Sequence, residues 1–327
     1  MKLVSRLAVT LTVANCALAF TGCSIGAGNQ DSGGARLTAT RDFGNIAVLR
    51  AAPQSIPEGE TAMRLLQRHA TDVETRYGGR FVQAINGIRS STKNGRRSDW
   101  FYYVNGIEED VGAAEQKIHG GDHVWWDYRE WTAAMRVPAV VGSFPEPFAH
   151  GADGKRFPIR IDCAQKAEDT CDRLADRLSG AGIDASKTAL GAPAGKELLR
   201  FVVGTWGDVR SDGAARLLER GPGESGVFMK VGAAPGGGYR FDLLDREGAV
   251  TRTLTRGAGV VAATRFEEQQ PTWVVSGTDD AGLDAAVQLL DKRILRDRYA
   301  VASDAGTPID LPTEARTGSP PGEADQR

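Results

Sequence analysis

The sequence predicts two domains, an α+β domain followed by an α/β domain with a mixed sheet. Residues 36–132 contain segments typical of two strands, one helix and three more strands, in that order. Residues 138–302 instead alternate strand and helix patterns. Their combined length exceeds what one hydrophobic core usually serves, which favours two cores. The boundary falls between Ala133 and Pro138, where an aromatic-rich segment ends.

The first domain is predicted to start with a β-hairpin followed by a helix. The segments ARLTATRDFG and NIAVLRAAP are typical of two paired strands. From Thr61 to Val73 apolar side chains recur at helical spacing, and Thr61 suits the N-cap position. The apolar face of this helix carries Met63, Leu66, Ala70 and Val73.

Three strands rich in aromatic and β-branched residues complete the domain, in GRFVQAINGI, DWFYYVNGI and DHVWWDYREW. Successive side chains of a strand point to opposite faces, so the last two strands place aromatic rings on both faces. One face carries Trp100, Tyr102, Val104, Val124, Trp126 and Tyr128, and the other carries Phe101, Tyr103, Trp125 and Asp127. Because one helix covers only one face, the second aromatic face must contact the second domain, a partner or a ligand.

Residues 41–131 resemble a known domain family in these same segments. The most specific parts are an aromatic-Val-Asn-Gly string at 102–106 and a Gly-Asp-x-Val-x-Trp string at 121–126. The stretch is similar to the transcobalamin carboxy-terminal-like domain family, which implies a β-grasp-like fold. In animal cobalamin carriers this domain closes over the corrin beside a helical domain, and bacterial members are secreted or lipid-anchored. This sequence lacks the helical-barrel domain, so the resemblance implies a transporter or a helical-barrel protein as partner.

The resemblance implies cobalamin or a related corrinoid as a ligand, although no cofactor is required. A corrin is a broad, partly apolar disc with an amide rim, which flat aromatic side chains and hydrogen bonds at its edge would suit. The candidate ligand-binding residues are Tyr103, Asn105, Trp125, Trp126 and Tyr128. The alternative is that the rings pack against the second domain and that Asn105-Gly106 forms a turn.

The first residues predict export and lipid attachment. The opening MKLVSR carries two positive charges, an apolar run follows it, and Cys23 comes directly after Gly22. This order is typical of a bacterial lipoprotein signal over residues 1–22, with Cys23 lipidated. The predicted location is the extracytoplasmic face of the cell membrane, held by the lipid anchor. The alternative is ordinary secretion with Cys23 as a free thiol.

Two further features follow from the predicted location and from composition. Outside the cytoplasm an isolated cysteine pair is most simply a disulfide, so we expect Cys163 and Cys171 to be bonded. Residues 23–35 are typical of a flexible tether. Residues 303–327 are rich in Pro, Gly and charge, which predicts a disordered tail.

The second domain contains two similar segments, RFVVGTWGDVRSDGAARLL and TWVVSGTDDAGLDAAVQLL. Each runs from a strand through Gly-Thr into a helix, which predicts an internal βα repeat, with RIDCAQKAEDTCDRLADRL as a degenerate third copy. Parallel strands would bring a second set of candidates to one sheet edge, where α/β sheets bind ligands. This set is Thr205, Trp206, Asp208, Thr278 and Asp279. The alternative is ordinary turn and cap chemistry.

The sequence favours a binding protein over an enzyme. Ser225 in GPGESGV falls between a helix and a strand without the β-barrel pattern of a serine protease. His119 and His123 have helical metal-ligand spacing, but Gly120-Gly121 between them predicts a turn, so no metal site is expected. The chain has 40 basic and 42 acidic residues and no basic block, so nucleic acid is not an expected partner.

The sequence therefore predicts a lipid-anchored extracytoplasmic ligand-binding protein, with corrinoid capture for uptake implied by the resemblance. The alternative is a cell-envelope interaction or scaffold lipoprotein without a small-molecule ligand. The two hypotheses place the aromatic face differently. A ligand site needs a concave opening reached by Tyr103 or Trp125, whereas a seam between domains would bury both side chains without a pocket.

Overall fold

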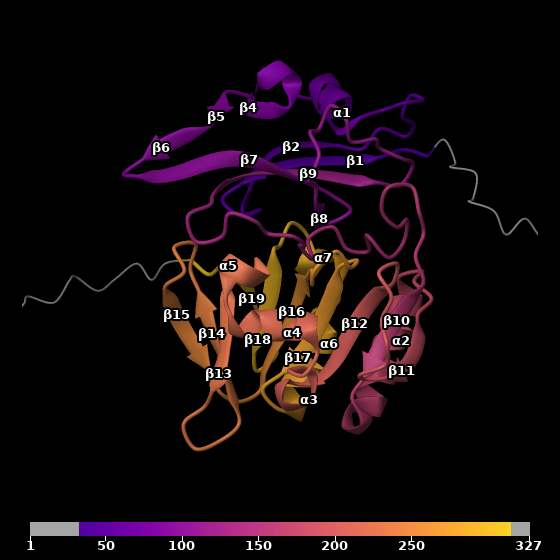
Figure 1. Ribbon diagram of the computed structural model, residues 1–327, viewed down its shortest axis with the longest axis vertical. Helices are drawn as coiled ribbons and strands as arrows, with labels where there is room; N and C mark the ends of the chain where they lie inside the picture. The colour runs from indigo at the N-terminus through magenta and orange to yellow at the C-terminus, as the bar shows by residue number, and fades with distance from the viewer. Residues whose placement is uncertain (1–32, 315–327) are drawn as a thin grey trace, which may run out of the picture.

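The computed structural model describes residues 33–314. The predicted signal, Cys23 and most of the tether lie outside these residues, as does the end of the predicted tail. The two predicted domains stack on each other, and the main sheet of the first domain lies between helix α1 and the second domain (Figure 1). The chain is thus a mixed α+β protein with several sheets, as the sequence predicts. Within residues 33–314 no helix is long and apolar enough to cross a membrane.

The first domain is built on a sheet in the order β2-β1-β9-β7-β6, with β8 paired to β7. The neighbours β1 and β9 run parallel, while β1–β2 and β7–β9 are antiparallel, so the predicted hairpin is present. A separate small sheet contains β3, β4 and β5. The elements are β1 (Arg36–Arg41), β2 (Ile46–Ala51), α1 (Ala62–His69), β3 (Val73–Arg76), η1 (Tyr77–Gly79), β4 (Phe81–Ile85), β5 (Ile88–Arg89), β6 (Ser91–Lys93), β7 (Arg96–Val104), β8 (Ile107–Glu108) and β9 (His123–Glu130).

Helix α1 begins as predicted and ends earlier than predicted. The Thr61 hydroxyl accepts a hydrogen bond from the Arg64 amide at 3.2 Å, which satisfies one free donor of the first turn. The helix stops at His69, and Val73 begins β3 instead of continuing the apolar face. Met63 and Leu66 are buried in a core shared with Trp100, Val104, Val124 and Trp126 from the predicted helix-covered face of the sheet.

The second domain contains a seven-stranded mixed sheet in the order β11-β10-β12-β17-β16-β18-β19. The first four strands run parallel and the last three join antiparallel. A second sheet contains β13, β14 and β15. The elements are β10 (Ile159–Cys163), η2 (Gln165–Ala167), α2 (Glu168–Gly180), β11 (Ser186–Ala189), β12 (Leu199–Thr205), α3 (Trp206–Val209), α4 (Gly213–Arg216), η3 (Leu217–Glu219), α5 (Pro222–Ser225), β13 (Met229–Ala233), β14 (Tyr239–Leu244), β15 (Val250–Leu254), β16 (Ala258–Thr264), β17 (Thr272–Gly277), α6 (Asp280–Leu289), α7 (Lys292–Leu295), β18 (Ala300–Asp304) and β19 (Thr307–Leu311).

The central strands of this sheet are buried on both faces, which explains their uninterrupted apolar runs. On one face Phe201 and Val203 pack in a core with residues of α2 and α6. On the other face Val202 packs in a core with the small sheet and with first-domain residues. The three predicted βα segments differ in their helices, because β17 leads into the ten-residue α6 while β12 leads into the short α3, α4 and η3.

Two expectations about the second domain have clear outcomes. Cys163 at the end of β10 and Cys171 in α2 form the predicted disulfide, with Cα atoms 6.2 Å apart. The predicted disordered tail starts too early, because residues 303–314 are part of the fold. Strand β19 pairs with β18, and its Leu311 is buried while Ile309 packs beside it. Composition alone missed these two apolar side chains, which share one face of the strand.

Candidate functional site

The second aromatic face of the first domain lies against the second domain. Tyr103 and Trp125 are fully buried, and both rings contact Tyr299, which comes from the segment before β18. The Tyr299 hydroxyl donates to Asp127 at 2.9 Å, and the Trp125 indole donates to Thr40 at 2.8 Å. We call this contact, formed by Tyr103, Trp125, Asp127 and Tyr299, the interdomain seam.

The other three first-domain candidates also have structural partners. Asn105 adopts a φ of 54° in a tight turn, and its buried amide donates to Asp122 at 2.7 Å and to the Gly151 carbonyl at 2.8 Å. Trp126 stacks on Tyr102 in the α1 core, with ring centroids 4.8 Å apart. Tyr128 is half-buried and donates to the Arg89 carbonyl at 2.9 Å. Because Tyr103, Asn105, Trp125 and Trp126 are buried, a ligand would have to open the protein to touch them.

The second set of candidates meets at one sheet edge, since Thr205 of β12 lies opposite Gly277 of β17. Its polar groups, however, are used locally. The Thr205 hydroxyl donates to Asp208 at 2.7 Å, and Asp279 caps α6 by accepting from the Gly282 amide at 2.8 Å. The Thr278 hydroxyl accepts from the Ala258 amide, and Trp206 is fully buried. These contacts are the turn and cap chemistry of the alternative interpretation.

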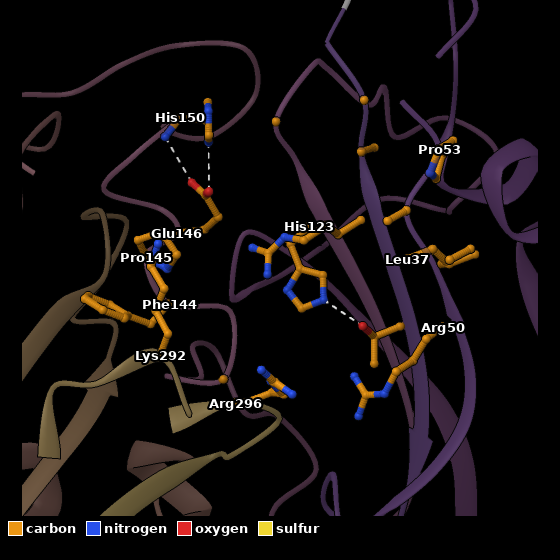
Figure 2. Close-up of a pocket in the computed structure, with 18 of the residues that line it drawn as sticks. Leu37, Arg50, Pro53, His123, Phe144, Pro145, Glu146, His150, Lys292 and Arg296 are labelled. Atoms are coloured by element: carbon orange, nitrogen blue, oxygen red, sulfur yellow. Dashed lines mark hydrogen bonds and ion pairs between the residues drawn. The ribbon is translucent and has the colours of Figure 1, made fainter. Parts of the chain in front are cut away.

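Several cavities combine residues of both domains, and one of them lies beside the seam. This interdomain cleft has a volume of about 770 Å³. Its first-domain wall comes from residues 34–38 and 50–54, with Gly121 and His123. Its second-domain wall comes from Gly142, Phe144, Pro145, Glu146, His150, Lys292, Arg296 and Asp297. Figure 2 shows Arg50 and Arg296 on opposite sides of the cleft, with Glu146 and His150 farther along the second-domain wall.

His123 joins the two walls at the base of the cleft. Its Nε2 lies 3.0 Å from the Thr38 hydroxyl of β1, and its Nδ1 lies 3.0 Å from the Ser143 hydroxyl. Burial holds the pKa of His123 well below its usual range, and the nearby charges of Arg36 and Arg50 lower it further. The ring is therefore neutral near pH 7 and serves as a hydrogen-bonding bridge between the domains.

Two glycines allow the domains to approach this closely. A Cβ atom on Gly142 would lie 2.6 Å from the Trp125 ring and 2.6 Å from the Arg298 amide nitrogen. Gly44 has a φ of 83°, and a side chain there would collide with the Asp297 carbonyl. The seam thus depends on two positions without side chains, one from each domain.

The charged groups of the cleft are predominantly basic. Arg36 and Arg50 come from the first domain, and Lys292 and Arg296 come from the second. The two acidic groups already have partners. Glu146 is buried and accepts from the His150 amide at 3.0 Å and from its Nδ1 at 2.8 Å, and Asp297 pairs with Arg50.

The sequence does not reveal this site, because its residues come from five separate segments. None of the segments that supply the basic groups carries a recognisable motif, and single arginines on a strand or a short helix are usually solvated surface residues. The basic groups become a cluster only when the seam brings β1 and β2 next to α7. Within residues 33–314 no group of three or more His, Cys, Asp or Glu side chains is placed to hold a metal ion.

Comparison with known proteins gives a partial match. A family model described as a domain of unknown function (DUF4430) matches residues 59–130, which is the helix-to-β9 part of the first domain. No curated protein matches the chain.

Proposed function

We propose that this protein is a lipid-anchored extracytoplasmic binding protein that holds a small molecule in the interdomain cleft. The observation that carries the proposal is the cleft of about 770 Å³ lined by both domains. Small-molecule sites fall in this range of volumes and occur preferentially at domain interfaces. The seam supports the proposal because it fixes the two walls relative to each other. A preformed site loses less conformational entropy when it binds.

The resemblance to the transcobalamin carboxy-terminal-like family makes cobalamin the first ligand to test. The stretch matched by the domain of unknown function, residues 59–130, falls within the resembling residues 41–131. With Tyr103 and Trp125 buried, a corrinoid would have to enter the cleft or a surface shared with a transporter or helical-barrel partner. The proposed role is then capture and handover near the membrane.

The alternative, a cell-envelope scaffold, has one observation in its favour. The scaffold hypothesis expects the second aromatic face to be buried against another part of the protein, and Tyr103 and Trp125 are buried against the second domain. It also expects no pocket, whereas a cleft opens directly beside the seam. The cleft is the reason we prefer a binding protein.

The test is calorimetric titration of the full-chain protein, purified in mild detergent, with a panel that includes cyanocobalamin, small organic anions and neutral sugars. Size exclusion would show whether corrinoid colour elutes with the protein. Saturable binding of any panel member at micromolar concentration, lost on substitution of residues in the cleft, supports the proposal. A panel without any binder, with and without a candidate partner protein, favours the scaffold hypothesis.

Membrane attachment has its own test, because Cys23 lies outside the described residues. We expect the chain to incorporate a palmitate analogue and to fractionate with membranes. The Cys23→Ala variant should lose the label and leave the membrane fraction. A variant that keeps both properties would contradict the lipid anchor.

A further inference from the structure

We propose that the ligand of the interdomain cleft is a small organic anion with two or more negative charges, held by basic side chains from both domains. This inference rests on the proposed function and adds the chemical class of the ligand. Its basis is the charge, the pairing and the domain of origin of the side chains in the cleft.

The basic groups of the cleft differ in whether they have acidic partners. Among residues 33–314, neither Lys292 nor Arg296 has a carboxylate within ion-pair distance. The acids next to them in sequence are already engaged, since Asp291 pairs with Arg293 and Asp297 pairs with Arg50. Both side chains are exposed at the cleft, so they can reach a bound molecule.

Arg36 and Arg296 line the cleft from different domains. Among residues 33–314, the Arg36 guanidinium makes one long hydrogen bond, which it donates to the Ser143 carbonyl at 3.4 Å. Burial lowers the pKa of Arg36, the charges of Glu146 and Asp297 oppose that change, and Arg296 acts on Arg36 as a weaker like charge. Two cations from separate domains repel each other across the cleft, and an anion between them would remove the repulsion and bond to both. Guanidinium groups suit this role because they bind carboxylate and phosphate oxygens through paired hydrogen bonds.

The acidic groups neutralise only part of this cluster, because two acidic side chains line the cleft against four basic ones. Glu146 is buried and directed to His150, and the carboxylate of Asp297 is taken by Arg50. Burial raises the pKa of Glu146, while the hydrogen bond from His150 opposes the rise. The cleft therefore presents an excess of positive charge to a solute.

The apolar lining indicates an organic ligand instead of a bare inorganic ion. Leu37 and Pro53 form part of the first-domain wall, and Phe144 and Pro145 form part of the second-domain wall. A volume of about 770 Å³ holds far more than a single phosphate or sulfate ion. A carbon skeleton with charged ends matches both kinds of surface.

The test is calorimetric titration of the full-chain protein with citrate and pyrophosphate as polyanion probes, and with sulfate and a neutral disaccharide for comparison. The variants are Arg36→Gln and Arg296→Gln. The matched control is Arg293→Gln, because Arg293 lies in the same helix, has a side chain 87% exposed and does not line the cleft. We expect citrate to bind, and each cleft substitution to weaken its binding roughly tenfold to a hundredfold while the control changes it little. Binding should also weaken as salt is raised.

The outcomes separate this inference from the proposed function. If cyanocobalamin or the sugar binds in the cleft and the two arginine substitutions have no effect, the binding function stands and the anion inference fails. If no panel member binds, both fail. Equal losses in Arg293→Gln and Arg296→Gln would indicate nonspecific surface attraction and would overturn the inference. Sulfate or pyrophosphate binding as strongly as citrate would overturn the organic part of it.

Discussion

Trp125 of strand β9 and Tyr299 of the second domain pack edge to face, with ring centroids 5.6 Å apart and an interplanar angle of 78°. Both side chains are buried, and Tyr103 and Phe43 also contact Tyr299. Edge-to-face aromatic pairs stabilise the folded state by more than the burial of their apolar area alone would give. The aromatic strand of the first domain therefore serves the docking of the two domains, and the candidate ligand site lies next to this contact.

The Trp125→Ala substitution should strongly destabilise the protein. Removing a buried indole lowers the free energy of unfolding by about 3–5 kcal/mol. The loss has two parts, the apolar burial of the indole and the cavity that is left behind. The measurement is urea unfolding of the full chain followed by circular dichroism. Tyr77→Ala is the control, since Tyr77 is 79% exposed and should shift the unfolding free energy by no more than about 0.5 kcal/mol. A fully stable Trp125→Ala protein would contradict the seam.

The Asp127→Asn substitution should remove part of the pH dependence of stability. Burial raises the pKa of Asp127 to about 6, although Thr40, Tyr299, the Gly44 amide and the charge of Arg129 all oppose the rise. The folded pKa is above the unfolded value of about 3.8, so the native state binds the proton more tightly. The stabilising contribution is complete below the unfolded pKa and is lost as pH rises through about 6.

The measurement for Asp127 compares unfolding free energies of both proteins between pH 4 and pH 7. The difference between the two curves isolates Asp127 from other buried acids such as Glu108 and Glu146, which both proteins share. We expect the wild-type curve to fall more steeply with pH than the variant curve. Parallel curves would show that Asp127 titrates alike in the folded and unfolded chains.

The sequence was informative wherever a local pattern determines the structure. The alternation of Trp100 to Val104 correctly sorted side chains between the two faces of β7, because strand geometry alone fixes it. The Thr61 cap followed from equally local chemistry, and the disulfide followed from the predicted export of the chain, which leaves one cysteine pair to be bonded. What the second aromatic face would contact could not be decided, because Tyr299 is remote in sequence and carries no motif.

The candidate site was harder to predict for the same reason. Arg36, Arg50 and Arg296 are ordinary surface arginines in sequence terms. Their proximity depends on the angle at which two domains dock, and Gly44 and Gly142 permit that docking. The tail was predicted to be disordered because residues 303–314 contain only two large apolar residues, Ile309 and Leu311. Its order comes from the pairing of β19 with β18, which composition does not reveal.

Removing the disulfide should lower stability to a moderate extent. Cys163 and Cys171 are eight residues apart, so the bond restricts only a short loop of the unfolded chain. Loop-closure entropy for such a loop corresponds to about 2–3 kcal/mol at 25 °C. The measurement is urea unfolding with and without a reductant, and the double variant Cys163→Ala, Cys171→Ala provides the control that reductant should not affect. An unchanged unfolding midpoint in reductant would contradict a stabilising role.

The Gly142→Ala substitution tests whether the seam depends on close backbone approach. The new methyl group would lie 2.6 Å from the Trp125 ring and from the Arg298 amide nitrogen, so one of these groups must move. Overpacking of this kind typically costs about 1–3 kcal/mol. Gly180→Ala is the matched control, because it lies at the end of α2 with no atom within 4 Å of the added methyl. A helical Gly→Ala change there should be neutral or slightly stabilising.

The double variant Gly142→Ala, Trp125→Ala makes this test specific for the seam. Removing the indole creates space for the methyl group, so the two losses in unfolding free energy should sum to more than the loss in the double variant. Coupling energies between contacting residues are about 0.5–3 kcal/mol, whereas the losses at independent sites add within about 0.3–0.5 kcal/mol. Strictly additive losses would mean that Gly142 and Trp125 act independently, and that the clash at Arg298 alone determines the effect.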